Sequence, residues 1–572
     1  MRRIVAAALP TAESRSFFRW AVGAYAVVTV VLLAASLRRT DGAMVYALDD
    51  PAIHLSIAET LVHHGTWGVE PGQFQSASSA PLWTVLIAGF VLVAPFVASY
   101  AALLLNGLAA AAVVALLARG QTTLHPSRRR PLDVLATAVI AVVVLFLPAA
   151  TFVGMEHLLH AALVLAAVQS FSRPPASDAP AWRRAAPYVL VALASLTRME
   201  TAWVAAALGV AVLATCLPRP DGASVPPWAP QLRRVVLLGL SAGLPIVAFS
   251  LFNLAMGQSW LPNSVVAKSA SLNGEGGGFD LLTSLGRLTA DSVLALLVIL
   301  CTGLAIAGWR ERRRWFVPAA TTVLASLAHV TLAEVGWYER YQIYLIVLAV
   351  YTLSLAAGDL LPGGGGAEAS TGAGAGTAPS RRSLAPLFVL SVLLLSAIKV
   401  DLTLKVPRAI DDTYEQRYQA AVFLDRYYDG QPVATGELGY ISLEHNGPIT
   451  DLYGLGDYEV LQARRRFHQQ APPEYWSSLA VERGFRVVAV YPTTLLLETP
   501  PHWILVGSWT IPRDAVSAFT EEFQFWATVP EEVAPLITHL EEFAAELPAG
   551  VESRIQDLAQ YRADVMLAEQ GS

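Results

Sequence analysis

Two adjacent carboxylates, Asp49 and Asp50, stand in a polar segment that follows a long apolar run and extends to Ala80. A carboxylate can take a proton from a hydroxyl group when a like-charged neighbour and partial desolvation raise its pKa. The pair could also bind Mg²⁺ or Mn²⁺ through oxygen, but two carboxylates are too few for a closed metal site. Because Pro51 follows directly, the pair could also cap a helix predicted over 52–61, which would hold the carboxylates rigidly.

Further ionisable residues stand at the ends of apolar runs. Because a charge at membrane depth costs about 2.5 to 3.5 kcal/mol, such groups usually pair with one another or line a polar cavity. Glu156, Arg198, Glu200 and Arg340 are therefore candidates for one cavity. The polar and aromatic residues that accompany them are His157, Asn263, Lys268, Trp337, Tyr338 and Tyr341.

These residues also have structural interpretations. Glu156 and Arg198 could form an ion pair between neighbouring helices, which is a common way to tolerate charge in a membrane. Arg340 and Lys268 could extend toward lipid headgroups. The aromatic residues beside Arg340 could form an interfacial belt.

Histidines and cysteines give no metal-ligand pattern. His54, His63 and His64 follow the acidic pair at a spacing that matches no ligand motif, and we interpret them as solvated loop residues. Cys216 and Cys301 stand singly in different apolar runs, so we expect small core residues and no disulfide framework.

The 572-residue chain is 54% hydrophobic and only 15% charged. Since a membrane-crossing helix needs roughly 20 mostly apolar residues, this composition predicts a polytopic α-helical membrane protein of about eleven spans. Two regions are ambiguous: 185–198 is short for a span, and 80–117 could cross once or twice. The clearer spans are 17–37, 132–150, 156–171, 202–217, 234–253, 289–308, 315–333, 340–358 and 384–400.

Clusters of arginine between the apolar runs predict the orientation, because short basic loops stay on the cytoplasmic side. All six clusters become cytoplasmic if 80–117 makes one net crossing and 185–198 crosses once; Arg38 and Arg39 alone break the rule. The N-terminus is then cytoplasmic, and the acidic pair and the charged residues at span ends face outward. The clusters are Arg2–Arg3, Arg119 with Arg128–Arg130, Arg183–Arg184, Arg233–Arg234, Arg310 with Arg312–Arg314, and Arg381–Arg382.

The composition divides the chain into a transmembrane module over 1–400 and a soluble extracytoplasmic domain over 401–572. The module contains a first external loop at 38–80 and a Gly/Ala/Ser-rich segment at 361–382, which predicts a disordered cytoplasmic loop. Residues 401–572 carry 26 acidic and 12 basic residues, so this acidic surface argues against a nucleic-acid partner.

Hydrophobic patterning in the soluble domain predicts an α/β fold. We expect an amphipathic helix over 414–428 and a strand around 486–490. Acidic helices are expected near 515–525, 531–545 and 551–568.

Several short motifs occur in the order that is found in the GT-C polyprenyl-phosphate-dependent glycosyltransferases. The acidic pair and the later Ser78-Ser79-Ala80-Pro81 resemble their first external loop. Four further segments resemble their later motifs, and within this family the sequence resembles the AftB-like arabinofuranosyltransferases. These segments are Gly154-Met155-Glu156, Leu196-Thr197-Arg198-Met199-Glu200, Leu261-Pro262-Asn263 through Lys268, and Glu339-Arg340-Tyr341.

The resemblance implies that the chain transfers a sugar from a polyprenyl-phosphate donor to a glycan, lipid or protein acceptor at the outer face of a bacterial cell membrane. Asp49 would be the base and Asp50 would position the acceptor or a cation. The donor phosphate would be bound by Arg198, Lys268 and Arg340. Substrate contacts would come from Glu156, His157, Glu200, Asn263, Trp337 and Tyr338.

Two other functions are compatible with parts of the sequence. A lipid or glycolipid flippase would also place charges in membrane cavities, but the charged groups gather at one face and the chain shows no strong internal repeat. A membrane-anchored sensing or adhesion protein would need only one anchor. The sequence leaves open the sugar, the acceptor, the metal requirement, the role of the C-terminal domain and the oligomeric state.

Overall fold

The chain forms two compact units, each built from several sequence segments. The helical unit contains Met1–Leu32, Leu103–Ala248 and Phe279–Leu404, and the sheet unit contains Leu33–Ala102, Phe249–Gly278 and Lys405–Ser572. The computed structural model describes residues 9, 11–122, 142–143, 145–218, 224–267, 286, 292–311, 313–333, 338–360, 385–469, 471–494 and 499–561.

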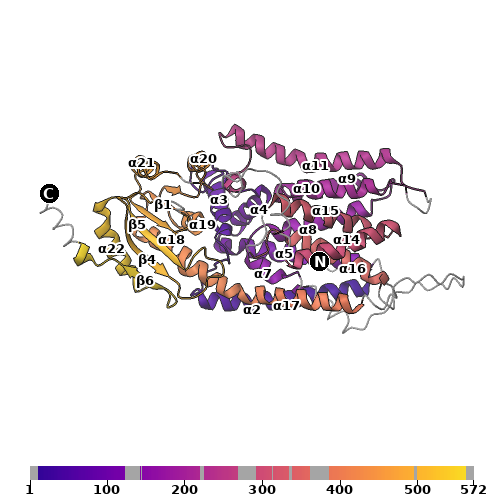
Figure 1. Cartoon of the computed structure of the whole chain (residues 1–572), viewed down its shortest axis with the longest axis horizontal. Coiled ribbons are helices and arrows are strands. Elements are labelled where there is room, and N and C mark those ends of the chain that lie inside the picture. Colours follow the sequence, from indigo (N-terminus) through magenta and orange to yellow (C-terminus); the bar gives the residue numbers. More distant parts are fainter. Residues whose placement is uncertain are drawn as a thin grey trace. The chain divides into compact units, whose positions relative to one another are not determined.

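Long apolar helices dominate the helical unit, because its Ala-, Leu- and Val-rich runs favour helix and can satisfy their backbone groups internally. Helix α15 packs on α10 and α14, and α8 packs on α9 and α16 (Figure 1). The helices with residues in this unit are α2 (Ala12–Arg39), α5 (Ala101–Thr122), α7 (Leu147–Phe152), α8 (His157–Ser172), α9 (Ala181–Thr197), α10 (Thr201–Ala214), α11 (Trp228–Ala255), α14 (Ser292–Arg310), α15 (Phe316–Leu332), α16 (Ile343–Leu360) and α17 (Ala385–Asp412).

Most predicted spans coincide with a described helix. Within the described ranges, four helical stretches are long and apolar enough to cross a membrane: Ala12–Arg39, Pro95–Gly120, Trp228–Ala255 and Val293–Arg310. The ambiguous stretch 185–198 is part of the 17-residue helix α9. The predicted span 132–150 falls mainly outside the described residues, as does the predicted loop 361–382.

The ambiguous stretch 80–117 forms a short helix followed by a long one. Helix α4 (Pro81–Val93) has 13 residues and is about 20 Å long, which is less than the roughly 30 Å of a bilayer core. A 3₁₀ turn, η1 (Pro95–Tyr100), leads into α5. The break follows from Pro95, which cannot donate the backbone hydrogen bond that would continue α4.

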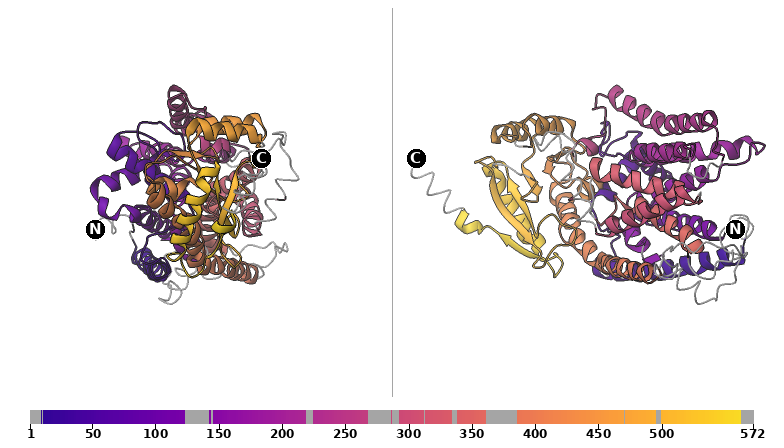
Figure 2. Two further views of the ribbon diagram at one scale, coloured as in Figure 1. Left: turned by 90° about the vertical axis from the view of Figure 1, so that its left-hand side faces the viewer. Right: turned by 45° about the vertical axis from the view of Figure 1, so that its right-hand side comes forward.

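The predicted α/β fold of the C-terminal domain is confirmed. Its six strands form one mixed sheet in the order β2-β1-β3-β5-β4-β6, with β1 parallel to β2 and β3 and the later pairs antiparallel. The sheet is drawn in orange and yellow in Figure 2. The strands are β1 (Val433–Thr435), β2 (Ile449–Asp451), β3 (Val487–Val490), β4 (Ile504–Thr510), β5 (Glu522–Ala527) and β6 (Glu552–Ile555). The helices are α18 (Gln419–Tyr428), α19 (Leu438–Glu444), α20 (Tyr458–Arg466), α21 (Pro473–Arg483) and α22 (Pro530–Ala544).

Of the three predicted acidic helices, 531–545 is confirmed as α22, whereas 515–525 is wrong, because these residues form a loop and the start of β5. The third, 551–568, begins with β6 and is helical over 558–561; residues 562–568 lie outside the described residues. In β5, Phe523, Phe525 and Ala527 are buried while the residues between them are partly exposed, which is the period of a strand. The predicted strand at 486–490 is confirmed as β3, and 414–428 is helical as a π-helical turn, η4 (Thr413–Tyr418), followed by α18.

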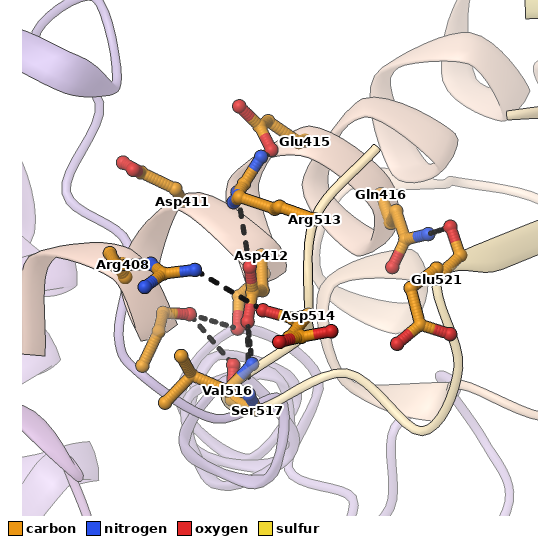
Figure 3. A network of polar contacts seen from close by, with 12 residues as sticks. Arg408, Asp411, Asp412, Glu415, Gln416, Arg513, Asp514, Val516, Ser517 and Glu521 are labelled. Carbon is orange, nitrogen blue, oxygen red and sulfur yellow. Dashed lines mark hydrogen bonds and ion pairs between the residues drawn. The ribbon is translucent and has the colours of Figure 1, made fainter. Parts of the chain in front are cut away.

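A buried aspartate holds the loop that begins at Arg513 (Figure 3). The carboxylate of Asp412 accepts hydrogen bonds from the backbone N–H groups of Val516 and Ser517 at 2.5 and 3.0 Å. It also accepts one from Arg513 at 3.0 Å. These bonds fix the loop to Asp412, the last residue of α17.

The predicted first external loop, 38–80, belongs to the sheet unit and packs on the C-terminal domain. Helix α3 (Asp50–His64) packs on α19, and the Ser56 hydroxyl donates to the carbonyl of Ser442 at 2.9 Å. Farther along the loop, a carboxylate oxygen of Glu70 accepts the N–H of Ile449 in β2 at 2.7 Å. The loop is therefore held by elements that follow it by more than 370 residues.

Candidate functional site

The helical unit brings four of the predicted site residues into direct contact. Arg198 follows α9 in an extended conformation and donates from Nη1 to Glu156 Oε1 at 2.5 Å, while its Nη2 is paired with Glu200. His157, the first residue of α8, lies 2.9 Å from Arg198 Nη1 through Nε2. The Glu156–Arg198 ion pair that the sequence suggested as a structural alternative is therefore present.

One donor of this guanidinium remains available. Arg198 Nε is buried and has no hydrogen-bond partner within the described parts of the chain. A buried donor without a partner costs free energy, so it favours a ligand that can accept its hydrogen.

A second arginine, Arg340, lies beside the same aromatic ring as Arg198. The Arg340 guanidinium lies 4.8 Å from the centroid of the Tyr341 ring, and that of Arg198 lies 5.5 Å from the same centroid. Arg340 Nη2 donates to the Tyr341 hydroxyl at 2.8 Å. The Tyr341 ring therefore lies beside two cations in a mostly apolar helical unit. The negative face of an aromatic ring stabilises cations placed in this way.

The turn that carries Arg340 is strained. Tyr338 and Glu339 both adopt left-handed backbone conformations, with φ of 62° and 52°, which non-glycine residues rarely do. Glu339 is paired with Lys399 of α17, whose side chain is fully buried and lies 4.6 Å from the centroid of the Phe146 ring. Strain of this kind concentrates at functional sites, where surrounding contacts maintain it.

A buried polar chain continues from the arginine cluster into the helices. His160 Nε2 lies 3.0 Å from the Thr201 hydroxyl, and His329 Nδ1 lies 3.1 Å from the Tyr344 hydroxyl. The rings of His160 and Tyr344 are in edge contact at 5.0 Å. These residues stand in apolar stretches of the sequence, and nothing in the sequence predicted that they would lie together.

Asp49 lies in the sheet unit, where both of its carboxylate oxygens accept hydrogen bonds. Oδ2 accepts the N–H of Gly439 at 2.6 Å and Oδ1 accepts the N–H of Tyr440 at 3.0 Å. Burial raises the pKa of the Asp49 carboxyl above its ordinary value, and the nearby Arg417 and the two amides oppose this rise. Asp49 stands at the N-cap position of α3, as predicted, but its side chain makes no cap hydrogen bond to that helix.

A buried arginine–glutamate pair lies near Asp49. Arg417 donates from Nε to Glu437 Oε2 at 2.6 Å, and its guanidinium lies 5.0 Å from the centroid of the Tyr491 ring. Burial raises the pKa of Glu437 to about 8; Arg417 opposes the rise and the neighbouring carboxylates of Asp49 and Asp50 add to it. The Arg417 guanidinium therefore interacts with the carboxyl groups of both Glu437 and Asp49 in a region removed from water.

The remaining predicted residues fall into separate places. Asn263 is fully buried in the sheet unit; its N–H donates to the carbonyl of Ser76, and its side-chain Nδ2 donates to Gln258 at 3.2 Å. Tyr338 is buried in the helical unit, whereas Lys268 and Trp337 lie outside the described residues.

The histidine interpretation needs correction. His54 is buried in α3 with Nδ1 3.0 Å from the Thr84 hydroxyl, so it is not a solvated loop residue. His63 and His64 are exposed, as predicted, but they lie in the last turn of α3 and not in a loop. Within the described ranges, no group of three or more His, Cys, Asp or Glu side chains is arranged to hold a metal ion.

The sequence did not predict a role for Arg417, Glu437 or Lys399. Arg417 and Lys399 stand in ordinary helical sequence, and only the fold gives them their partners.

Comparisons with known proteins give distant similarities. A family model described as a domain of unknown function (DUF8728) matches residues 408–527. No curated protein matches the chain. Among the solved structures that match, each at 13% identity, ArnT from Cupriavidus metallidurans bound to undecaprenyl phosphate has a TM-score of 0.48 and covers 88% of this chain and 98% of that one. The oligosaccharyltransferase AglB from Archaeoglobus fulgidus in complex with an inhibitory peptide and a dolichol-phosphate has a TM-score of 0.44 and covers 90% of this chain and 74% of that one. An Archaeoglobus fulgidus oligosaccharyltransferase in complex with Zn and sulfate has a TM-score of 0.43 and covers 87% of this chain and 73% of that one.

Proposed function

We propose that this chain is a membrane glycosyltransferase of the GT-C type, which transfers a sugar from a polyprenyl-phosphate donor to an acceptor hydroxyl. The observation that carries the proposal is the pair of guanidinium groups, Arg198 and Arg340, around Tyr341 in an apolar helical unit. Guanidinium groups bind phosphate through charge-assisted hydrogen bonds, and apolar helices suit the prenyl chain. The motif order in the sequence supports the same donor class.

The proposed step is an inverting displacement at the anomeric carbon. Asp49 takes the proton of the acceptor hydroxyl as that oxygen forms the new glycosidic bond. The bond between the anomeric carbon and the phosphate oxygen breaks, and its electron pair leaves with the polyprenyl phosphate. Arg198 and Arg340 stabilise the negative charge that develops there.

The other residues have supporting roles in this proposal. Glu156 and Glu200 orient the Arg198 guanidinium, to which both are bonded. Asp50 positions the acceptor, and Lys268 adds a third cation for the phosphate. His157, Asn263, Trp337 and Tyr338 contact the substrates.

Each carboxylate oxygen of Asp49 accepts one amide hydrogen and keeps a second lone pair, so Asp49 can still take a proton or bind a cation. Transfer measured after exhaustive chelation tests whether Mg²⁺ or Mn²⁺ is required. We place the reaction at the outer face of a bacterial cell membrane, with the C-terminal domain on the same side and a glycan, lipid or protein as acceptor.

The test uses the purified full-length chain in lipid nanodiscs with labelled polyprenyl-phosphate pentoses and hexoses, an arabinofuranosyl donor among them. We expect a new glycosidic bond, complete loss of transfer in Asp49→Asn, and at least tenfold weaker donor binding in Arg340→Ala. The matched control is Arg310→Ala, which removes an exposed arginine at the end of α14. Lipid movement without a new glycosidic bond in the unaltered chain would indicate a flippase instead.

A further inference from the structure

A short segment of the C-terminal domain binds the proposed base directly. The amides of Gly439 and Tyr440 donate to the two carboxylate oxygens of Asp49 at 2.6 and 3.0 Å. Because each oxygen has its own donor, the carboxylate can neither rotate about its bond to Cβ nor swing away without losing a hydrogen bond.

Two further hydrogen bonds hold the same segment to the chain on either side of Asp49. The N–H of Tyr46 donates to the Tyr440 hydroxyl at 2.9 Å, and the Ser56 hydroxyl donates to the carbonyl of Ser442 at 2.9 Å. The backbone on both sides of Asp49 is thereby fixed to α19, and the orientation of the carboxylate follows from it.

Gly439 is needed because Asp49 approaches it closely. A Cβ atom at this position would lie 2.5 Å from both Cγ and Oδ2 of Asp49, and 2.3 Å from its carbonyl oxygen. Such distances are well inside van der Waals contact, and one of the opposing atoms belongs to the backbone. A side chain at 439 would therefore displace Asp49 itself.

We propose that Gly439, with the amides of Gly439 and Tyr440, is a positioning element of the transfer site, so that the C-terminal domain contributes to the orientation of the catalytic base. This inference rests on the proposed role of Asp49. A base displaced by about 1 Å from its productive geometry can lose on the order of 100-fold in rate while substrate binding is retained. The inference gives part of the region matched by the family model of unknown function a specific task.

The main test compares Gly439→Ala with Gly89→Ala in the full-length chain. Gly89 lies in α4, where an added Cβ meets nothing within 4 Å, so this control adds the same methyl group without a collision. For Gly439→Ala we expect kcat to fall about 100-fold while the KM for the polyprenyl-phosphate donor stays within twofold. Gly89→Ala should keep both constants. A merely structural role for Gly439 would lower the amount of folded protein but leave kcat per folded molecule unchanged.

A second variant covers the case in which Gly439→Ala does not fold. Tyr440→Phe keeps the amide that holds Asp49 but removes the acceptor of the Tyr46 N–H, so the anchoring is loosened without a collision. We expect kcat to fall about tenfold with donor KM unchanged. Folded Gly439→Ala with the kcat of the unaltered chain, or Tyr440→Phe with unchanged kcat, would overturn the inference.

Failure of the inference can be distinguished from failure of the proposed function. If Asp49→Asn abolishes transfer while Gly439→Ala retains it, only the positioning role is wrong. If Asp49→Asn retains transfer, the base is another residue, and the inference is wrong with it. If the unaltered chain transfers no sugar from any donor tested, the proposed function is wrong.

Discussion

At the residue scale, the chemistry of Glu437 depends on its burial beside another carboxylate. Its pKa is raised from 4.5 to about 8, so the folded chain binds the proton of Glu437 more tightly than the unfolded chain does. The stabilisation from this proton is therefore complete at low pH and is lost as the pH rises from about 4.5 toward 8. Glu437→Gln keeps an oxygen for Arg417 but cannot ionise, so the free energy of unfolding should fall less steeply with pH. The difference in slope should be at most about 1.4 kcal/mol per pH unit.

Unfolding of the full-length chain between pH 5 and pH 8 measures this difference. Glu546→Gln is the matched control, because it removes an exposed carboxylate that is bonded to Arg426 at the protein surface. Equal slopes for Glu437→Gln and the unaltered chain would show that Glu437 ionises normally in the folded protein.

The chemistry of individual residues predicted the contacts among the charged residues of the site but not the partners of Asp49. Glu156, Arg198 and Glu200 stood out as charges at the ends of apolar runs, and the cost of isolating charges there predicted that they would meet. The partners of Asp49 are backbone amides that follow it by 390 residues, and an amide has no side-chain signature. Such a contact is decided by the fold, which no local pattern encodes.

At the scale of elements, local composition was misleading where a tertiary contact holds a loop. The acidic stretch 515–525 looks helical by composition, yet Asp412 takes the amides of Val516 and Ser517 and β5 begins at Glu522. The β-branched run at β3 was predicted correctly, because its burial on both faces of the sheet agrees with its propensity.

The same contact leads to a prediction about the loop that carries Arg513. Asp412 is fully buried, and Asp412→Ala would leave two backbone amides and the Arg513 guanidinium without this acceptor. We expect the free energy of unfolding to fall by about 3 kcal/mol, with the loop cut preferentially in limited proteolysis. Asp514→Ala is the control, since Asp514 is exposed in the same loop and its carbonyl, which accepts from Arg408, is retained. Equal stability of the two variants would show that the loop is held by other contacts (Figure 3).

At the scale of the whole molecule, the sheet unit is assembled from three separate stretches of the chain, so its C-terminal part is incomplete alone. Helix α19 buries Leu438, Tyr440 and Ile441, and it packs on α3 from the first external loop. A fragment that begins at Lys405 lacks α3 and Asp49, which leaves this face of α19 uncovered and the amides of Gly439 and Tyr440 without their acceptor.

We therefore expect hydrogen exchange at α19 to be at least tenfold faster in the 405–572 fragment than in the full-length chain, because the loss of burial and of two charge-assisted bonds lowers the local opening free energy. Strand β5 provides the internal control: its neighbours β3 and β4 both lie within the fragment, so its amides should keep their protection. Exchange followed by mass spectrometry on both proteins resolves the two peptides. Equal protection of α19 in both proteins would mean that the C-terminal domain folds independently of the loop that carries Asp49.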